Sequence, residues 1–460
     1  MKLEFFGDVY ATLFTKQLQE SLEGGLRENY VGEEEDGFPK GFLRASRKHK
    51  VWWDACWTRD AGSFIREIAV RGYLDIAAVC AEFLIDNVDK NKKGFYSFPM
   101  YYNREGASGD GDEQDGTANI ILGLIELYLR LEDSDSKRKI HTFLTNSSSP
   151  IKGIIAELKE TELILGNGEF GGGWGVGGLY YNVVQNFMVA SALRVYYRYI
   201  SQESEVIEMA DRMYESIKKH FIVDNRFIWC MDENFNEADV SFAPHSNGSA
   251  NINGIAGAFY DGFYADKSEF NTELRNTFMH LFDGDAHREY LHNTYGMMPY
   301  TKAFPSGHSE EFIADASWLA YCECYLAETA VVLGDADLLT KTIRYIVGQT
   351  AYKGHMPKSY TEDELLAQDH YWFSERNFSP EWEGAWEEGC GSLNLINIAE
   401  PLRLARMIAG LNGTADITPI LPNGFSGFKA SGYSVVENGN VRYYDVVYDK
   451  GELTMSEVNA

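Results

Sequence analysis

The chain has 460 residues, 45% of them hydrophobic, so it can bury a large core and is long enough for more than one domain. Its 69 Asp and Glu against 41 Lys and Arg give a formal net charge of −28, which excludes nucleic acid and anionic membranes as expected partners. A neutral or cationic ligand is favoured instead. The 14% of aromatic residues would suit a carbohydrate ligand, because flat rings stack on sugar rings, although core packing explains many of them too.

The N-terminus and the cysteines indicate where the protein works. The first residues are acidic and lack the apolar stretch of a signal peptide, and no run approaches the length of a membrane span. We therefore expect a cytoplasmic protein. The 6 Cys show neither CxxC nor metal-ligand spacing, so we interpret them as buried free thiols and expect no metal and no cofactor.

Two kinds of helical pattern alternate along the chain. Amphipathic patterns are expected at residues 9–22, 74–88, 136–144 with 151–163, 203–221, 270–282 and 336–347. Less polar patterns alternate with them at residues 61–70, 117–131, 182–199, 251–263, 317–333 and 392–408. This alternation predicts an all-α fold, an (α/α)6 barrel in which the less polar helices form an inner ring and the amphipathic helices an outer one.

A polar run precedes each expected inner helix. These runs are Trp57-Thr58-Arg59-Asp60, Glu113-Gln114-Asp115-Gly116, Gly173-Trp174-Gly175, Asn247-Gly248-Ser249, Asp315-Ala316-Ser317-Trp318 and Glu387-Glu388-Gly389. In such a barrel the connections that enter the inner helices all lie at one end. We therefore expect the runs to converge on a single pocket.

The helical periodicity ends near residue 408, where prolines and glycines follow. Residues 433–436 and 441–448 flank Asn438-Gly439, a pair typical of a β-hairpin turn. We predict one barrel domain over residues 1–410, and a small β extension over residues 411–460 that packs on it.

Two of the polar runs carry a family resemblance. The run Trp57-Thr58-Arg59-Asp60-Ala61-Gly62 follows Trp52 and Trp53, and Gln114-Asp115-Gly116-Thr117-Ala118 opens a later inner helix. With these motifs the chain resembles the glucoamylase-type glycoside hydrolases. More loosely, it is similar to the wider six-hairpin glycosidases, which include neutral invertases and trehalases. The resemblance covers most of residues 1–410.

The resemblance implies that Arg59 and Asp60 line the subsite of the non-reducing sugar and bind its O4 and O6 hydroxyls. The chemistry is consistent, because a carboxylate accepts two hydroxyl protons and a guanidinium donates to the same hydroxyls. The alternative is a capping Asp with an outward-facing Arg at the start of a helix.

Glycoside hydrolysis needs two carboxyl groups that face each other across the scissile bond. In the glucoamylase pattern the general base lies just before the last inner helix, where Glu381 follows Pro380 and resembles it. Glu383, Glu387 and Glu388 remain alternatives, since a glutamate at this position can simply complement the helix dipole.

The general acid departs from the family pattern. The family places it in a Trp-Glu-Glu element, but this chain has Trp174-Gly175-Val176 there. Two replacements are available: Glu169 in the same glycine-rich loop, and Asp115, where the invertase-like branch places its acid. Neighbouring carboxylates such as Glu113 could raise the pKa of Asp115, and desolvation could raise that of Glu169.

Other side chains around these motifs are expected to touch the sugar. The expected contacts are Trp53, Trp57, Glu113, Gln114, Trp174, Trp318, Trp382 and Glu388, with Tyr180, Trp372 and Trp386 as further ring platforms. The alternative for each aromatic residue is core packing.

Together these features predict an exo-acting, inverting glycoside hydrolase that releases a monosaccharide, glucose for preference, from small oligosaccharides or glycosides. One alternative is a carbohydrate phosphorylase or lyase with the same fold. Another alternative is a sugar-binding protein without catalytic activity. The reason for this alternative is that Val176 stands where the family pattern has a carboxylate.

Overall fold

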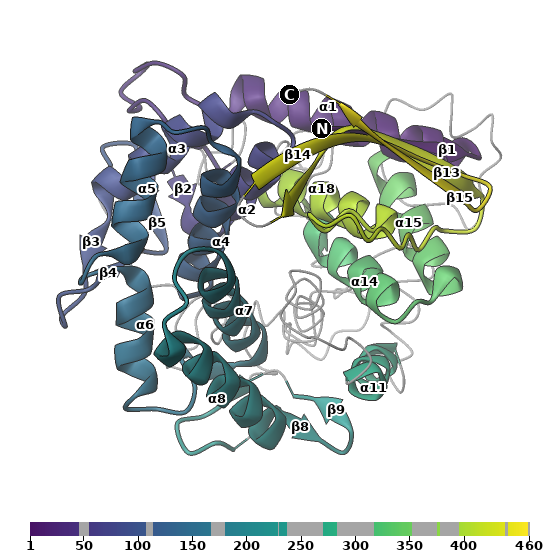
Figure 1. The fold of residues 1–460 in the computed structure, drawn as a ribbon. Coiled ribbons are helices and arrows are strands. Elements are labelled where there is room, and N and C mark those ends of the chain that lie inside the picture. The colour runs from purple at the N-terminus through teal and green to yellow at the C-terminus, as the bar shows by residue number, and fades with distance from the viewer. Residues whose placement is uncertain are drawn as a thin grey trace.

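The computed structural model describes residues 1–45, 55–106, 114–166, 180–228, 230–236, 270–282, 317–351, 375–377, 395–437 and 440–458. Helices dominate these ranges (Figure 1). Within them no helix combines the length and the apolar character that crossing a bilayer requires.

Five nearly apolar helices surround a common centre (Figure 1). They are α2 (Thr58–Val70), α4 (Gln114–Arg130), α7 (Val183–Tyr199), α14 (Ala320–Val332) and α18 (Leu395–Ala409). In space they pack in the order α14, α18, α2, α4 and α7. The helix expected at 251–263 lies outside the described residues, so closure of the inner ring stays a prediction.

A second set of helices lies outside this arc. It consists of α1 (Val9–Glu28), α3 (Leu74–Asn87), α5 (Asp135–Thr145), α6 (Pro150–Leu158), α8 (Ser204–Phe221), α11 (Asn271–Phe282) and α15 (Ala336–Ala351). Among the described residues the predicted alternation of inner and outer helices is confirmed. Helix α1 runs six residues beyond its predicted end at residue 22, through Gly24 and Gly25.

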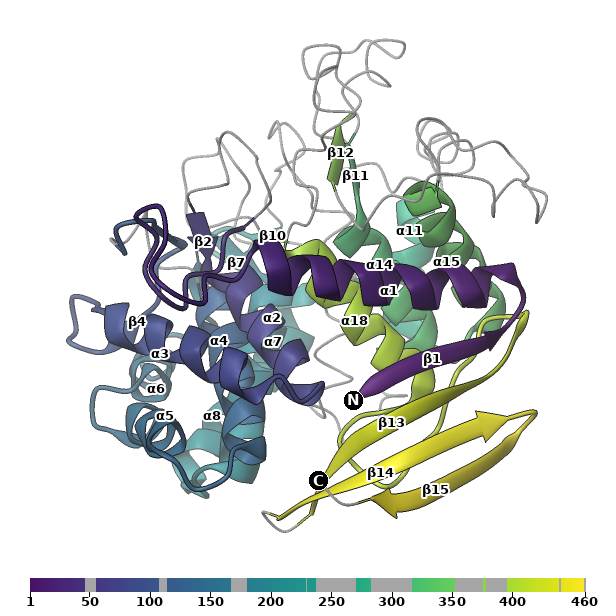
Figure 2. The same ribbon diagram turned by 90° about the horizontal axis from the view of Figure 1, so that it is seen from above.

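Short strands gather at one end of the inner helices (Figure 2). Strands β2 (Ala55–Trp57), β7 (Tyr180–Asn182) and β11 (Ser317–Leu319) lead directly into α2, α7 and α14. They pair with β5 (Tyr101–Asn103), with β6 (Leu165–Gly166) and β10 (Cys230–Met231), and with β12 (Glu375–Asn377), respectively. We call this end the rim. Two further hairpins join β3 (Asp89–Lys90) to β4 (Tyr96–Ser97) and β8 (Ile222–Val223) to β9 (Arg226–Phe227).

An antiparallel sheet lies at the opposite end (Figure 2). Its strand order is β1 (Lys2–Gly7), β13 (Phe425–Glu437), β14 (Asn440–Asp449) and β15 (Glu452–Val458). The predicted hairpin is confirmed, with Val436 opposite Val441. The sheet of the C-terminal extension thus also contains an N-terminal strand that the sequence did not reveal. The domain division at residue 410 stays a prediction.

Buried ion pairs tie the inner helices together. Glu67 of α2 accepts hydrogen bonds from Arg406 of α18 at 3.0 and 2.5 Å and from Arg71 at 2.8 Å. Burial alone would raise the pKa of Glu67, but these guanidinium groups and that of Arg66 outweigh it and lower the pKa to about 2. Ion pairs between Glu67 and the surrounding arginines therefore link α2 to α18 in this part of the helical arc.

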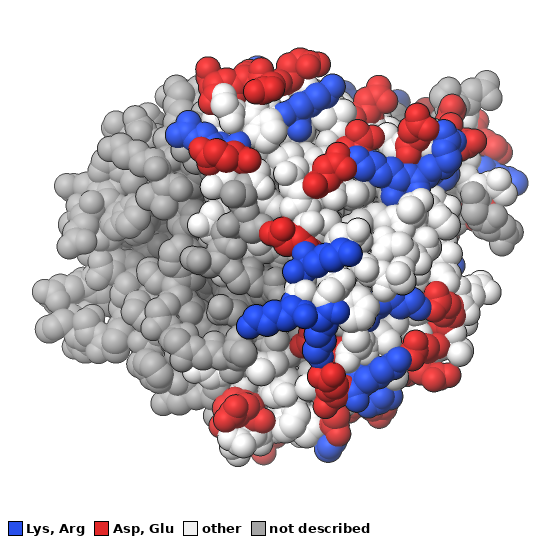
Figure 3. Space-filling view, turned by 90° about the vertical axis from the view of Figure 1, so that its left-hand side faces the viewer, with Lys and Arg blue, Asp and Glu red and all other residues white. Residues whose placement is uncertain are grey.

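The outer surface over α3, α5 and α6 carries both signs of charge (Figure 3). Lys139 pairs with Asp86 at 2.7 Å and Lys93 with Glu160 at 2.6 Å. Such exposed pairs contribute little stability each. Among the described residues of this face, Lys and Arg side chains lie interspersed with Asp and Glu side chains.

Candidate functional site

The start of α2 is fixed by the rim strand beside it. Trp57 is the N-cap residue and makes no side-chain capping bond. The Thr58 hydroxyl instead donates to the carbonyl oxygen of Pro99 at 2.7 Å, and the Trp57 ring lies 5.2 Å from that of Tyr101. These contacts fix the position of the first turn of α2, and so the positions of the next two residues, Arg59 and Asp60.

Arg59 and Asp60 occupy the first turn of α2 and are both buried, with 8% and 3% exposure. The Arg59 Nε lies 3.4 Å from Asp60 Oδ1. Asp60 is the third helical residue and not the cap, and Arg59 does not face outward. The alternative of a capping Asp with an outward-facing Arg is therefore wrong. Arg59 and Asp60 instead form a buried pair of opposite charge.

Glycines bring the second motif against the first. A Cβ on Gly116 would stand 2.3 Å from the Thr58 hydroxyl oxygen, and one on Gly62 would stand 2.5 Å from the Asn119 backbone. No real side chain tolerates such distances, so only glycine allows α2 and α4 to approach this closely. The first turns of the two helices consequently lie in direct contact.

Asp115 is the second residue of α4 and is 1% exposed. Its carbonyl oxygen accepts from the Asn119 amide at 3.1 Å, and the Asn119 side-chain oxygen accepts from Ser63 of α2 at 3.2 Å. Gln114 opens the helix and is half-buried. The structure thus brings Asp115 to the same end as Arg59 and Asp60, while the roles assigned to all three remain predictions.

Most other predicted site residues lie outside the described residues. These are Trp53, Glu113, Glu169, Trp174, Glu381, Trp382 and Glu388. The backbone of Trp318 is described: it belongs to β11, pairs with Arg376 and comes directly before α14, at the rim. The choice of general acid and base therefore stays a prediction.

Charged residues that the sequence analysis missed lie deeper in the inner helices. Arg403 of α18 donates to both carboxylate oxygens of Glu328 of α14, at 3.0 and 2.8 Å, and also contacts Glu400 at 2.5 Å. Burial raises the pKa of Glu328 to about 8; Arg403 opposes this rise and Glu400 adds to it. A carboxylate inside the apolar run of α14 was the available signal.

This cluster extends toward the rim through Tyr325. The Arg403 guanidinium lies 5.8 Å from the Tyr325 ring. Burial raises the pKa of Tyr325, Glu400 adds to this rise, and Arg403 and Arg59 oppose it. Arg59 therefore lies close enough to Tyr325 to act on it electrostatically.

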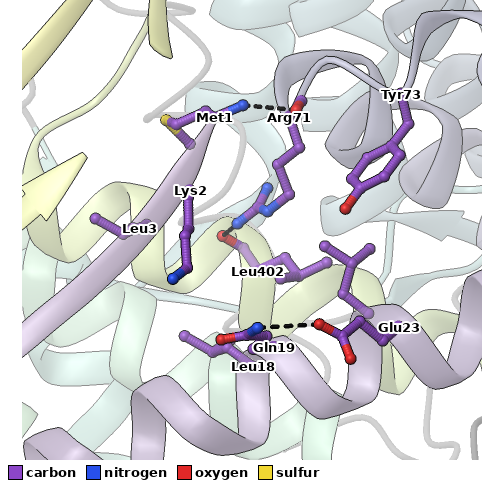
Figure 4. Close-up of a pocket in the computed structure, with 10 residues that line it drawn as sticks. Met1, Lys2, Leu3, Leu18, Gln19, Glu23, Arg71, Tyr73 and Leu402 are labelled. Carbon is purple, nitrogen blue, oxygen red and sulfur yellow. Dashed lines mark hydrogen bonds between the residues drawn. The ribbon is translucent and has the colours of Figure 1, made fainter. Parts of the chain in front are cut away.

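A cavity of about 300 Å³ lies away from these residues (Figure 4). It is lined by β1, by α1, by Arg71 and Tyr73 of the turn between α2 and α3, and by Leu402 in the middle of α18. Arg71 lines it, but its guanidinium is engaged by Glu67 and by the Leu402 carbonyl oxygen at 3.1 Å. Among the described residues, no predicted sugar contact lines this cavity.

No group of three or more His, Cys, Asp or Glu side chains within the described ranges is arranged to hold a metal ion. Cys56, Cys80, Cys230 and Cys324 are buried free thiols, as predicted.

No protein-family profile matches this chain, and no curated protein matches its sequence. Its fold does resemble solved structures. A glycosidase variant in complex with glucose aligns with a TM-score of 0.55 at 12% identity, over 86% of this chain and 96% of its own. A wild-type glycosidase gives 0.53 at 11% identity with the same coverage. The cellobiose 2-epimerase of Spirochaeta thermophila gives 0.48 at 10% identity, over 86% and 98%.

At this level of identity the likeness concerns the fold. The chain has a helix-rich fold similar to that of solved glycosidases of the (α/α)6 type. The glucoamylase-type family, suggested by two motifs alone, stays a prediction.

Proposed function

We propose that the protein is an exo-acting, inverting glycoside hydrolase that releases a monosaccharide, glucose in the first instance, from small oligosaccharides or glycosides. The observation that carries the proposal is the contact between the first turns of α2 and α4. It gathers Arg59, Asp60 and Asp115, all nearly buried, at the rim end. The fold likeness to a glycosidase in complex with glucose supports the same substrate class.

In this proposal Arg59 and Asp60 hold the hydroxyls of the non-reducing sugar. A buried carboxylate and a guanidinium suit this task, because together they accept from and donate to neighbouring hydroxyls. Their low exposure would close the pocket behind the terminal sugar, which favours cleavage from a chain end.

The reaction itself needs one carboxyl group on each side of the glycosidic bond. Glu381 would act as general base and remove a proton from the attacking water, while Asp115 or Glu169 would protonate the departing oxygen. Inversion requires room for that water, which corresponds to a separation of about 6.5 to 9.5 Å between the two carboxyl groups.

A panel of disaccharides tests the proposal. Purified protein is incubated with maltose, isomaltose, kojibiose, trehalose, sucrose and cellobiose, with and without phosphate, and released monosaccharide is measured. We expect release from at least one α-linked sugar without any need for phosphate. Strict phosphate dependence would instead indicate a phosphorylase, and an unsaturated product a lyase.

A variant series assigns the base in the same assay. Glu381→Gln should lower kcat by about 10²- to 10⁴-fold, since this is the usual contribution of a general base. Glu383→Gln, two residues away, serves as the matched control and should keep most of the activity. Sugar binding without release from any member of the panel would contradict the proposal and favour a binding protein.

A further inference from the structure

Gln185 is a fully buried amide whose two polar side-chain atoms have no hydrogen-bond partner. It is the third residue of α7, and its backbone N–H donates to the side chain of the N-cap residue Asn182 at 3.0 Å. Leaving a buried donor or acceptor without a partner destabilises the folded protein, because the group has lost its hydrogen bonds to water.

The position of Gln185 matches that of the site residues on the neighbouring inner helices. Asp60 is the third residue of α2, Asp115 the second of α4, and Gln185 the third of α7. Helix α4 packs against both α2 and α7. Because a helix rises 1.5 Å per residue, all three side chains leave within the first turn at the rim end.

The backbone around the amide makes room for it. A Cβ on Gly166 would stand 2.1 Å from the Gln185 amide nitrogen and 2.2 Å from its oxygen. Gly166 pairs with Tyr180 in the rim sheet that leads into α7. Because Gly166 has no side chain, the amide has space to lie at this point of the rim, although it gains no hydrogen bond from the protein.

We propose that Gln185 is a sugar-binding residue of the rim site and that its amide bonds two adjacent free hydroxyls of the substrate. This inference rests on the proposed function and adds a third helix to the site. One amide offers an acceptor and donors in one plane, and neighbouring sugar hydroxyls each donate and accept, so one vicinal pair satisfies both groups.

The structural alternative makes the opposite prediction for stability. If Gln185 served the fold, its replacement would destabilise the protein. As an unsatisfied amide that awaits a ligand, it costs stability in the free protein, and an apolar side chain of similar length should be tolerated or should stabilise.

The test compares three variants of the full chain by thermal unfolding, glucose titration and hydrolysis. Gln185→Met should leave the Tm of the free protein unchanged or higher, while the Kd for D-glucose and the KM rise about tenfold or more at similar kcat. Gly166→Ala should also weaken glucose binding, because it displaces the amide without removing it. Gln17→Met is the matched control, since Gln17 is equally buried and unpartnered but lies on outer helix α1.

The outcomes separate this inference from the proposed function. Unchanged glucose affinity in Gln185→Met, or a fall in Tm of several degrees with affinity intact, would overturn the inference while leaving hydrolysis by the wild type untouched. Glucose binding that depends on Gln185 in a protein that hydrolyses nothing would keep the inference and overturn the hydrolase. If the wild type does not bind D-glucose, the inference fails as well.

Deoxy sugars locate the hydroxyl pair. The test uses 2-, 3-, 4- and 6-deoxy-D-glucose, each of which lacks one hydroxyl. Wild type and Gln185→Met should bind two of these analogues equally weakly, namely the two whose missing hydroxyls are neighbours on the sugar ring. The remaining analogues should keep the difference between the two proteins. A difference that persists for every analogue would rule out the paired contact.

Discussion

The two ends of helix α2 bury charges in different ways. Toward the sheet end, Glu67 is held by Arg406 and Arg71 through hydrogen bonds of 2.5 to 3.0 Å, and its pKa falls to about 2. At the rim end, Arg59 and Asp60 approach each other at 3.4 Å, beyond the usual range of a strong charge-assisted bond.

This difference indicates a division of labour along the helix. Toward the sheet end the ion pairs of Glu67 join α2 to α18, whereas at the rim end the proposed function assigns Arg59 and Asp60 to sugar hydroxyls. The Gln185 amide, which lies at the rim end and has no partner, fits the same division. Replacing matched residues at the two ends should therefore separate stability from activity.

The largest effect is expected at the sheet end. Glu67→Gln leaves Arg406 and Arg71 buried without their counter-charge, so unfolding free energy should fall by about 3 to 5 kcal/mol. Urea unfolding followed by tryptophan fluorescence measures the loss. The folded fraction should keep kcat/KM within a few-fold of the wild type. A stable but inactive variant would place Glu67 in the site and break the comparison.

The matching change at the rim should act on activity. Asp60→Asn keeps the shape but removes the charge that accepts sugar hydroxyls, so kcat/KM should fall about a hundredfold or more. Because the buried Arg59 loses a counter-charge, the Tm should also fall, but by less than in Glu67→Gln, where two arginines lose theirs. Steady-state kinetics on the sugar cleaved in the panel measures the first effect and thermal unfolding the second. An active but unstable variant would reverse the roles assigned to the two ends.

Much of this architecture follows from sequence periodicity. The alternation of apolar and amphipathic segments located every described helix, because packing of one face dominates helix formation. The predicted end of α1 was too early, because Gly24 and Gly25 weaken the helical signal although both are buried within the helix. Strand β1 was missed because its pairing with β13 joins residues that are far apart in sequence.

The site was predictable only where a motif marked it. The runs around Asp60 and Asp115 pointed to one end of the barrel, and the structure places their helix starts in contact. Gln185 carried no motif, and only its burial in three dimensions distinguishes it; Glu328 had only the weak signal of a carboxylate within an apolar run. Sequence spacing cannot show which polar residues of an inner helix find partners and which do not.

Two glycines at the contact between α2 and α4 allow a smaller version of the same comparison between the rim end and the rest of the helix. Gly116→Ala would press against Thr58, and Gly123→Ala would press against the Gly62 carbonyl oxygen, where a Cβ would stand 2.6 Å away. Both should destabilise by about 1 to 3 kcal/mol through overpacking. Only the first lies beside Arg59, so only Gly116→Ala should raise KM strongly. Equal kinetic effects from the two variants would show that the spacing of the whole helix pair matters more than the first turn.

A further effect concerns pH. With its pKa raised to about 8 in the folded protein, Glu328 stabilises the fold at low pH and loses this contribution as pH rises through about 8. Glu328→Gln removes the titrating group. The Tm of the variant relative to wild type should therefore increase between pH 5 and pH 9, as measured by thermal unfolding across that range. A constant difference would mean that Arg403 keeps Glu328 ionised throughout.

The most direct test of the whole account is a crystal structure of Glu381→Gln with an uncleaved disaccharide. We expect the terminal sugar at the rim, within hydrogen-bond distance of Arg59 and Asp60. The residue at position 381 should face Asp115 or Glu169 across the glycosidic bond at about 6.5 to 9.5 Å. A sugar bound at the sheet end, or carboxyl groups more than about 12 Å apart, well outside the inverting range, would contradict it.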